Sequence, residues 1–119
     1  MKISLGTPEN QIIVDTDRVA FFQSDDHYAY VYYDNNQHFM LPVGLSIIEQ
    51  TLKSVKQDDM LLMRFGRSYI INLLKVVHIN LQRKEMTLIN LPTGFYTVQL
   101  SRPSLKVAMD CLRACYGAR

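Results

Sequence analysis

Hydrophobic and polar residues alternate along most of the chain, and a period of two residues is typical of β-strands buried on one face. The clearest case is residues 95–100, where alternate side chains from Tyr96 onward should point inward. Similar runs, rich in β-branched and aromatic residues, predict further strands at 12–14, 19–22, 28–33, 37–41, 61–65, 69–71, 76–81 and 86–91. Turn-forming residues at 34–36 and 92–94 predict hairpins between neighbouring strands.

A different period, with apolar residues three or four positions apart, predicts a helix in the middle of the chain. The residues that form this stripe are Leu45, Ile48, Leu52 and Val55. Gly44 or Ser46 would cap its N-terminus, and Ser46 followed by Glu49 fits a capping box. Asp58 and Asp59 would end the helix.

A second, short helix is expected from about residue 103 onward, with an apolar stripe of Leu105, Met109 and Leu112. Ser101 or Arg102 would lie near its N-cap and Pro103 in its first turn. The short turns between strands favour antiparallel pairing over crossover connections. We therefore expect a single domain, residues 1–119, with a mostly β, antiparallel fold, one helix mid-chain and a short C-terminal helix.

The composition is that of an ordinary folded protein. Hydrophobic residues make up 48% of the 119 positions and charged residues 20%, which argues against disorder. No apolar run approaches the roughly 18 residues of a membrane helix. Gly6 and Pro8 interrupt the N-terminal stretch before a signal-peptide core could form. We therefore expect a cytoplasmic protein without membrane contact.

Charge is divided unevenly between the two halves of the chain. Residues 1–60 carry four Lys and Arg against nine Asp and Glu, a net of −5, whereas residues 61–119 carry nine against two, a net of +7. A half-chain this basic suggests a surface that faces a polyanion. Chance unevenness among solvated side chains is the competing interpretation.

Residue types that catalyse reactions or bind metals are too scattered to form a recognisable site. The histidines, at positions 27, 38 and 78, lack the spacing of metal ligands. Cys111 and Cys115 lie four residues apart on the expected final helix and are interpreted as free thiols. The five glycines are isolated, so no phosphate-cradling loop is predicted. The sequence therefore predicts no catalysis, no metal and no cofactor.

Two arginines lie where apolar runs give way to turns, and the first is Arg67. Gly66 would permit a tight turn that lifts Arg67 and Ser68 off the sheet. A guanidinium on such a turn, beside a hydroxyl and free backbone N–H groups, can bind a phosphate or a base edge. The alternative is a surface ion pair with a nearby acid at residues 58–59.

The second is Arg102, at the point where a strand passes into the final helix. A helix N-terminus carries partial positive charge and favours anions. Lys106, one turn on, would strengthen such a site. A run of tyrosines, at positions 28, 30, 32 and 33, could stack the bases of a single strand. Because these residues alternate within one strand, we favour core and cross-strand packing for them.

The order of these segments resembles a known family. The segment R-F-G-R-S-Y-I-I-N, residues 64–72, is similar to the R-x-H-R-S-y-x-V-N signature of LytTR-type DNA-binding domains. The segment V-Q-L-S-R, residues 98–102, follows at similar spacing before a terminal helix, as the family's x-V-S-R motif does. Upstream segments such as V-A-F-F-Q-S and G-L-S-I-I-E-Q-T-L also fit, so the resemblance covers about residues 10–115.

The resemblance implies an elongated, mostly antiparallel β fold that inserts loops into successive DNA grooves. Members are usually output domains of bacterial response regulators and bind paired direct repeats upstream of target genes. The contacts would come from the loop at 24–28, from the turn that carries Arg67 and Ser68 (the R-S turn) and from the start of the last helix. By this resemblance bases would be contacted by His27, Tyr28, Arg67, Ser68 and Arg102, and the DNA backbone by Arg64 and Lys106.

The partner implied is double-stranded DNA, at direct repeats in promoters, for transcription regulation. Two adjacent sites increase avidity, so dimerisation on DNA is expected. No phosphoacceptor domain lies within these residues, so they form either a stand-alone regulator or a piece of a longer protein. In the first case a separate sensor or receiver protein would supply the signal.

Two departures from the family pattern support a different function. Gly66 stands where the family usually has histidine, and Asp25 and Asp26 would repel phosphate unless they accept from cytosine amino groups. The alternative is therefore a LytTR-like protein-interaction module that has lost DNA binding and docks through its acidic half.

Overall fold

The structure is a computed structural model that describes residues 1–55 and 61–117. Within these residues the elements follow the order β1 (Lys2–Thr7), β2 (Asn10–Asp15), β3 (Val19–Asp25), β4 (Tyr28–Tyr33), β5 (His38–Leu41), α1 (Leu45–Ser54), β6 (Leu62–Phe65), β7 (Tyr69–Asn72), β8 (Val76–Asn80), β9 (Glu85–Asn90), β10 (Gly94–Gln99) and α2 (Arg102–Tyr116). Short 3-10 helices, Thr16–Arg18 and Leu73–Lys75, lead into β3 and β8.

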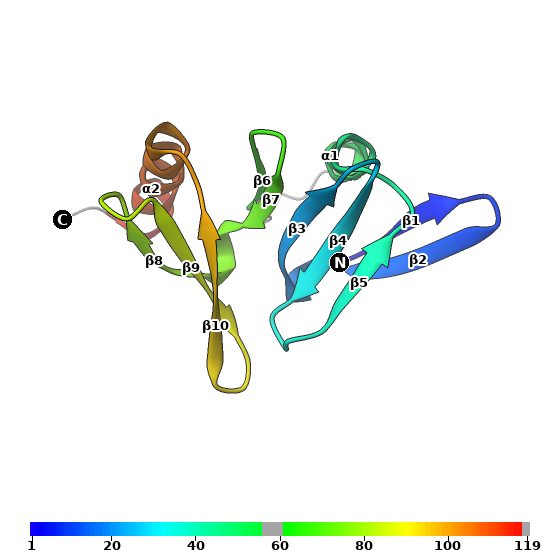
Figure 1. Cartoon of the computed structure of the whole chain (residues 1–119), viewed down its shortest axis with the longest axis horizontal. Helices are drawn as coiled ribbons and strands as arrows, with labels where there is room; N and C mark the ends of the chain where they lie inside the picture. The colour runs from blue at the N-terminus through cyan, green and yellow to red at the C-terminus, as the bar shows by residue number, and fades with distance from the viewer. Residues whose placement is uncertain (56–60, 118–119) are drawn as a thin grey trace.

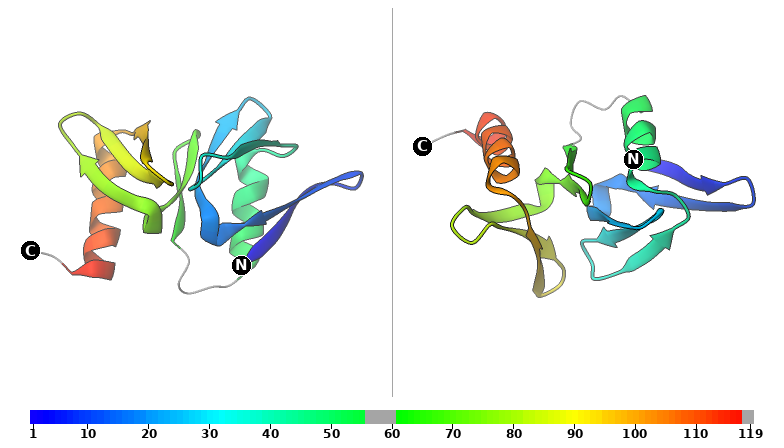
Figure 2. Two further views of the ribbon diagram at one scale, coloured as in Figure 1. Left: turned by 90° about the horizontal axis from the view of Figure 1, so that it is seen from below. Right: turned by 45° about the horizontal axis from the view of Figure 1, so that its top comes forward.

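All strand pairs are antiparallel and form three sheets. The β1–β2 ribbon is a two-stranded sheet, and the other two are a five-stranded sheet of order β5-β4-β3-β7-β6 and a three-stranded sheet of order β10-β9-β8. The molecule measures 49 × 28 × 27 Å, with α1 in one half, α2 in the other and the β6–β7 hairpin between them (Figures 1 and 2). The expected elongated, antiparallel β fold with two helices is confirmed, although α2 is longer than expected, at 15 residues.

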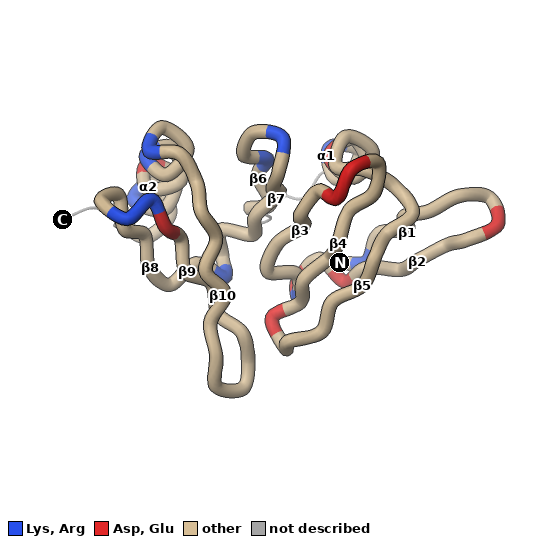
Figure 3. Tube along the Cα trace, viewed as in Figure 1, with Lys and Arg blue, Asp and Glu red and all other residues tan. Residues whose placement is uncertain are grey.

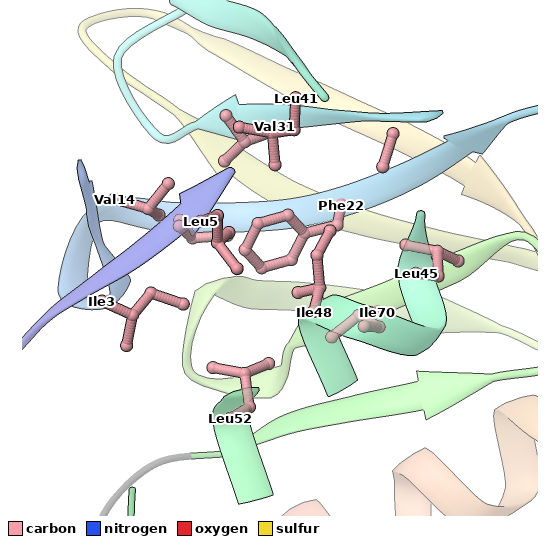
Figure 4. Packing of buried hydrophobic residues seen from close by; sticks show 12 residues of the cluster. Ile3, Leu5, Val14, Phe22, Val31, Leu41, Leu45, Ile48, Leu52 and Ile70 are labelled. Atoms are coloured by element: carbon pink, nitrogen blue, oxygen red, sulfur yellow. The ribbon is translucent and has the colours of Figure 1, made fainter. Parts of the chain in front are cut away.

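The first hydrophobic core lies between α1 and one face of the five-stranded sheet. Phe22 of β3 is fully buried at its centre, and Figure 4 shows its ring between Leu5 of β1 and Ile48 of α1. The helical stripe of α1 faces this core, because Leu45, Ile48 and Leu52 are its buried residues. α1 is thus a helix whose sequence period is satisfied by packing against β3 and its neighbours.

The second core fills the space between the other face of the five-stranded sheet, the three-stranded sheet and α2. Phe21 is buried here while the adjacent Phe22 is buried in the first core, so β3 is covered on both faces. The predicted alternation in β10 is confirmed, since Val98 and Leu100 are buried while Thr97 is exposed.

A buried carboxylate joins the two halves. Asp34, in the turn after β4, is 5% exposed and lies 3.0 Å from Lys75 Nζ and 3.4 Å from Arg18 Nε. The Leu91 N–H, at the end of β9, donates to the Asp34 carbonyl. Together these contacts attach the β9–β10 hairpin to the five-stranded sheet.

Three expectations about local structure were wrong or incomplete. No strand was expected before residue 12, yet β1 pairs with β2 along its whole length. The capping box is absent, because α1 begins after Gly44, which caps it without a side-chain hydrogen bond, and Ser46 lies inside the helix. The helix ends at Ser54, and the residues expected to end it, 58–59, lie outside the described part of the chain.

Candidate nucleic-acid interface

Two hairpin turns lie together at one end of the strands of the five-stranded sheet. β3 and β7 are antiparallel neighbours with Gln23 opposite Tyr69. The turn that follows β3 and the turn that precedes β7 therefore lie next to each other at the same end of the sheet. The Ser24 N–H donates to the Ser68 carbonyl at 2.8 Å and ties the two turns to each other. Two segments more than forty residues apart in sequence are therefore held side by side.

The β3–β4 turn is a tight, acidic one. Asp25 pairs with Tyr28, which leaves only Asp26 and His27 in the loop, and Asp26 has the positive φ of +56° that two-residue hairpin turns require. The side chains of His27 and Asp26 are 89% and 81% exposed, and His27 Nε2 lies 3.7 Å from Asp26 Oδ1. The loop expected at 24–28 is thus shorter than predicted, with two residues outside the strands. It presents the His27 imidazole and the Tyr28 phenol beside the Asp25 and Asp26 carboxylates.

The β6–β7 turn lifts Arg67 and Ser68 away from the sheet. Phe65 is buried before the turn, Gly66 adopts a φ of +64°, and Arg67 and Ser68 are exposed after it. A Cβ at Gly66 would have nothing within 4 Å, so backbone conformation alone favours glycine there. Arg67 forms no ion pair with any described residue, and the acids considered as its partners, at 58–59, are outside that set.

Arg64 is engaged within the protein. Its Nε donates to the Gly66 carbonyl at 3.0 Å, and its Nη1 lies 3.3 Å from Ser46 Oγ and 3.4 Å from Glu49 Oε1. The side chain is only 23% exposed. The guanidinium therefore braces the β6–β7 turn against α1, and the two residues expected to form a capping box instead hold Arg64.

Arg102 is the first residue of α2, and its side chain is exposed. The Ser101 hydroxyl caps the helix by accepting from the Ser104 N–H, as one of the two expected caps. Arg102 Nη1 donates to the Leu81 carbonyl at 3.3 Å, which orients the guanidinium toward the β8–β9 turn. Lys106 is exposed one turn along the same helix.

Two further cations, which were not predicted from the sequence, lie in the β8–β9 turn next to Arg102. Arg83 and Lys84 are exposed in the β8–β9 turn, and the Lys84 carbonyl accepts from the Leu100 N–H at 3.1 Å, just before α2. The only signal in the sequence was two successive cations at the turn. Their proximity to Arg102 depends on the pairing of β8, β9 and β10.

The three sites expected to contact DNA lie along one long edge of the molecule. In Figure 1 the start of α2, the β6–β7 turn and the β3–β4 turn all point toward the top of the view. Figure 3 shows basic residues at the start of α2, at the β8–β9 turn and at the β6–β7 turn, and acidic residues at the β3–β4 turn. The charge difference between the two halves of the sequence therefore appears along this edge.

Most tyrosines of the run at positions 28–33 pack against other side chains, which is the interpretation favoured from the sequence. The ring of Tyr32 stacks on Phe21 with centroids 4.6 Å apart and on His38 at 5.3 Å. Burial raises the pKa of Tyr69, which pairs with Phe65 directly beside the β6–β7 turn, and that of Tyr96, whose hydroxyl donates to the Tyr33 carbonyl at 2.7 Å. Tyr28 differs, because it is 49% exposed beside the β3–β4 turn.

The other residue types considered in the sequence are metal ligands, cysteines and long apolar segments. The described residues contain no group of three or more potential metal ligands. Cys111 and Cys115 are both free thiols, as interpreted from the sequence, and Cys111 Sγ lies 3.7 Å from Met63 Sδ. No described helix is long and apolar enough to cross a membrane.

A family model described as the LytTr DNA-binding domain matches residues 9–112. The chain belongs to the LytTr DNA-binding domain family. A solved structure with a similar fold is the LytTr DNA-binding domain of a putative methyl-accepting/DNA response regulator from Bacillus cereus, at 19% identity and a TM-score of 0.58. The match covers 98% of this chain and 97% of that one. No curated protein matches the sequence. Membership of this family indicates a DNA-binding domain that acts in transcription regulation.

Proposed function

We propose that this LytTr domain binds duplex DNA in a sequence-specific way and regulates transcription from paired direct repeats. The observation that carries the proposal is the placement of the R-S turn and the start of α2 on one edge, with exposed guanidinium groups at both. In the proposal, residues 1–119 form the single binding domain. Two copies occupy adjacent repeats, and a separate sensor or receiver protein in the cytoplasm controls them.

The dimensions of the molecule support contacts with successive grooves. One helical turn of B-DNA is about 34 Å long, so adjacent major grooves on one face are separated by that distance. The long axis of the protein is 49 Å, which exceeds one turn. Contacts spread along this axis can therefore reach two successive grooves without large bending of the DNA.

Each proposed contact follows from the chemistry of its side chain. Arg67 and Arg102 present planar forks of donors suited to the O6 and N7 atoms of guanine. Ser68 supplies a hydroxyl beside Arg67, and Lys106 binds a phosphate near the N-terminus of α2. We assign Arg64 a positioning role in place of the expected backbone contact, because its donors are engaged by Glu49, Ser46 and Gly66.

The β3–β4 turn is the third proposed contact, through His27 and Tyr28. Both side chains are exposed and can donate to a base edge. Asp25 and Asp26 oppose phosphate but can accept from the cytosine amino group. This turn therefore contributes to base preference more than to affinity.

Arginine substitutions test these roles. Arg67→Ala and Arg102→Ala should each weaken binding to a selected target duplex by about 1–3 kcal/mol and relax the base preference at one position. Arg113→Ala is the matched control, because this arginine is exposed near the C-terminal end of α2. Titration by fluorescence anisotropy measures all three. If both variants bind target and random duplex as the parent does, the assigned roles are wrong.

A second candidate function is protein interaction without DNA binding. The acidic β3–β4 turn favours it, since Asp25 and Asp26 are both exposed at the edge that would face phosphates. In this case Asp25→Asn with Asp26→Asn should leave DNA affinity undetectable at low salt. Under the DNA-binding proposal the same double substitution increases affinity for random duplex, because two repulsive charges are removed.

A further inference from the structure

The β8–β9 turn places a lysine in a backbone conformation that lysine disfavours. Lys84 has a φ of +57°, in the left-handed region that glycine, asparagine and aspartate occupy more readily. The turn itself is well formed, since the Asn80 side chain accepts from the Arg83 N–H at 3.0 Å and the Lys84 N–H reaches the Leu81 carbonyl at 3.3 Å. A lysine in this conformation is an unfavourable choice for folding alone, and such positions often coincide with binding sites.

The turn is also attached to the start of α2. The Leu81 carbonyl accepts from Arg102 Nη1, and the Lys84 carbonyl accepts from the Leu100 N–H. These two hydrogen bonds connect both ends of the turn to the segment that carries Arg102. The cations of the turn therefore have a fixed position relative to Arg102.

Positively charged side chains are grouped where the β8–β9 turn meets the start of α2. Arg83, Lys84, Arg102 and Lys106 are all exposed, and none forms an ion pair with a described residue. The neighbouring acid, Glu85, accepts from the Gln99 side chain at 3.4 Å. Four cations grouped in this way repel one another in the free protein, whereas a polyanion would neutralise them.

We propose that the β8–β9 turn is an additional DNA contact, in which Arg83 and Lys84 bind backbone phosphates beside the base read by Arg102. This inference rests on the proposed function, and it adds a contact that the LytTr motifs do not contain. The strained backbone at Lys84 and the two hydrogen bonds to the α2 segment are the observations that carry it. Phosphate contacts of this kind add affinity and fix register without reading sequence.

The test separates charge from backbone conformation. Lys84→Asn removes the cation and supplies a residue that tolerates positive φ, so the thermal midpoint should rise while DNA affinity falls. Together with Arg83→Gln, it should lower the slope of log affinity against log salt by about 1.8, or 0.9 for each phosphate that the protein no longer neutralises. The ratio of the parent's DNA affinity to that of the double variant should therefore fall roughly twelvefold between 50 and 200 mM salt. This factor is the slope change of about 1.8 applied to a fourfold change in salt concentration.

The controls distinguish the possible failures. Asn36→Gly changes another positive-φ residue, at the β4–β5 turn, and should leave the salt slope unchanged. If the double variant keeps the parent's affinity and slope while Arg67→Ala weakens target binding as expected, the additional contact is wrong and the proposed function stands. If target affinity falls but random-duplex affinity and slope do not, the turn only positions Arg102, and the phosphate contact is also wrong. If the parent protein itself binds neither selected nor random duplex at low salt, the proposed function fails.

Discussion

Replacement of Asp34 by asparagine should destabilise the protein and misplace its two halves. The Asp34 carboxylate lies between Lys75 Nζ at 3.0 Å and Arg18 Nε at 3.4 Å, and it is almost fully buried. Asparagine keeps the shape of the side chain but removes the charge, so two cations remain without their shared partner. The Asp34 backbone carbonyl, which asparagine retains, accepts from the Leu91 N–H, so the expected loss comes from the side chain alone.

The structure sets the size of the effect. Removal of one partner from a buried ion pair costs about 3–5 kcal/mol. Here the loss should be smaller, about 2–3 kcal/mol, since the side chains of Lys75 and Arg18 are 23% and 51% exposed and water compensates part of it. For a domain of 119 residues, 1 kcal/mol corresponds to roughly 4 °C in melting temperature, so we expect a decrease of about 8–12 °C.

Thermal unfolding followed by circular dichroism measures this decrease, with Glu9→Gln as the control at an exposed acid in the β1–β2 turn. A double-mutant cycle with Lys75→Met should give a coupling energy above about 1 kcal/mol between Asp34 and Lys75. A melting temperature within 2 °C of the parent, or a coupling energy near zero, would refute the reasoning. Target-DNA affinity should fall in Asp34→Asn at temperatures where it remains folded, because Arg67 and Arg102 belong to different halves.

Three further predictions concern the edge and its support. Gly66→Ala should cost about 1 kcal/mol by chemical denaturation, because the backbone has a φ of +64° but a Cβ meets no atom within 4 Å; a cost above 3 kcal/mol would indicate a clash that the structure lacks. Arg64→Met should weaken target binding without changing the salt slope, and a slope reduced by about 0.9 would show that Arg64 is a phosphate contact after all. Burial raises the pKa of Tyr96, so the neutral phenol stabilises the fold below pH ~10, and this contribution is lost as pH rises through the higher folded pKa. Tyr96→Phe should be about 1 kcal/mol less stable at pH 7 and decline less steeply above pH 10, and an unchanged alkaline profile would contradict this assignment.

Strand positions were largely predictable because local sequence and tertiary packing agree. β4 has the expected bounds, and β10 shows the expected alternation. β1 was missed because Gly6 and Pro8 interrupt the N-terminal stretch. In the structure a Cβ at Gly6 would clash with the Asn10 carbonyl oxygen, so glycine is what allows the β1–β2 hairpin to close. A residue that interrupts a pattern in sequence can thus be the one that permits the pairing.

The capping box failed for a different reason. Ser46 and Glu49 have the right spacing for it, but tertiary contacts with Arg64 use both side chains. A partner fifteen or more residues away cannot be read from local spacing.

The candidate interface was predictable where a single turn carries it and unpredictable where several elements meet. Gly66, Arg67 and Ser68 are consecutive, so their turn could be read directly. The closeness of Arg83 and Lys84 to Arg102 follows from the three-stranded sheet and from hydrogen bonds to Leu81 and Lys84 carbonyls. Long-range pairing of this kind leaves no local pattern in the sequence.

Genomic selection of bound fragments tests the central claim most directly. Purified protein is mixed with fragmented genomic DNA at low salt, and the retained fragments are sequenced. Sequence-specific binding predicts an enriched motif made of paired direct repeats. The two repeats should lie a whole number of helical turns apart, because two copies then bind the same face of the duplex. Retention of fragments without any enriched motif, or of none at all, would contradict sequence-specific binding and favour protein interaction through the acidic half.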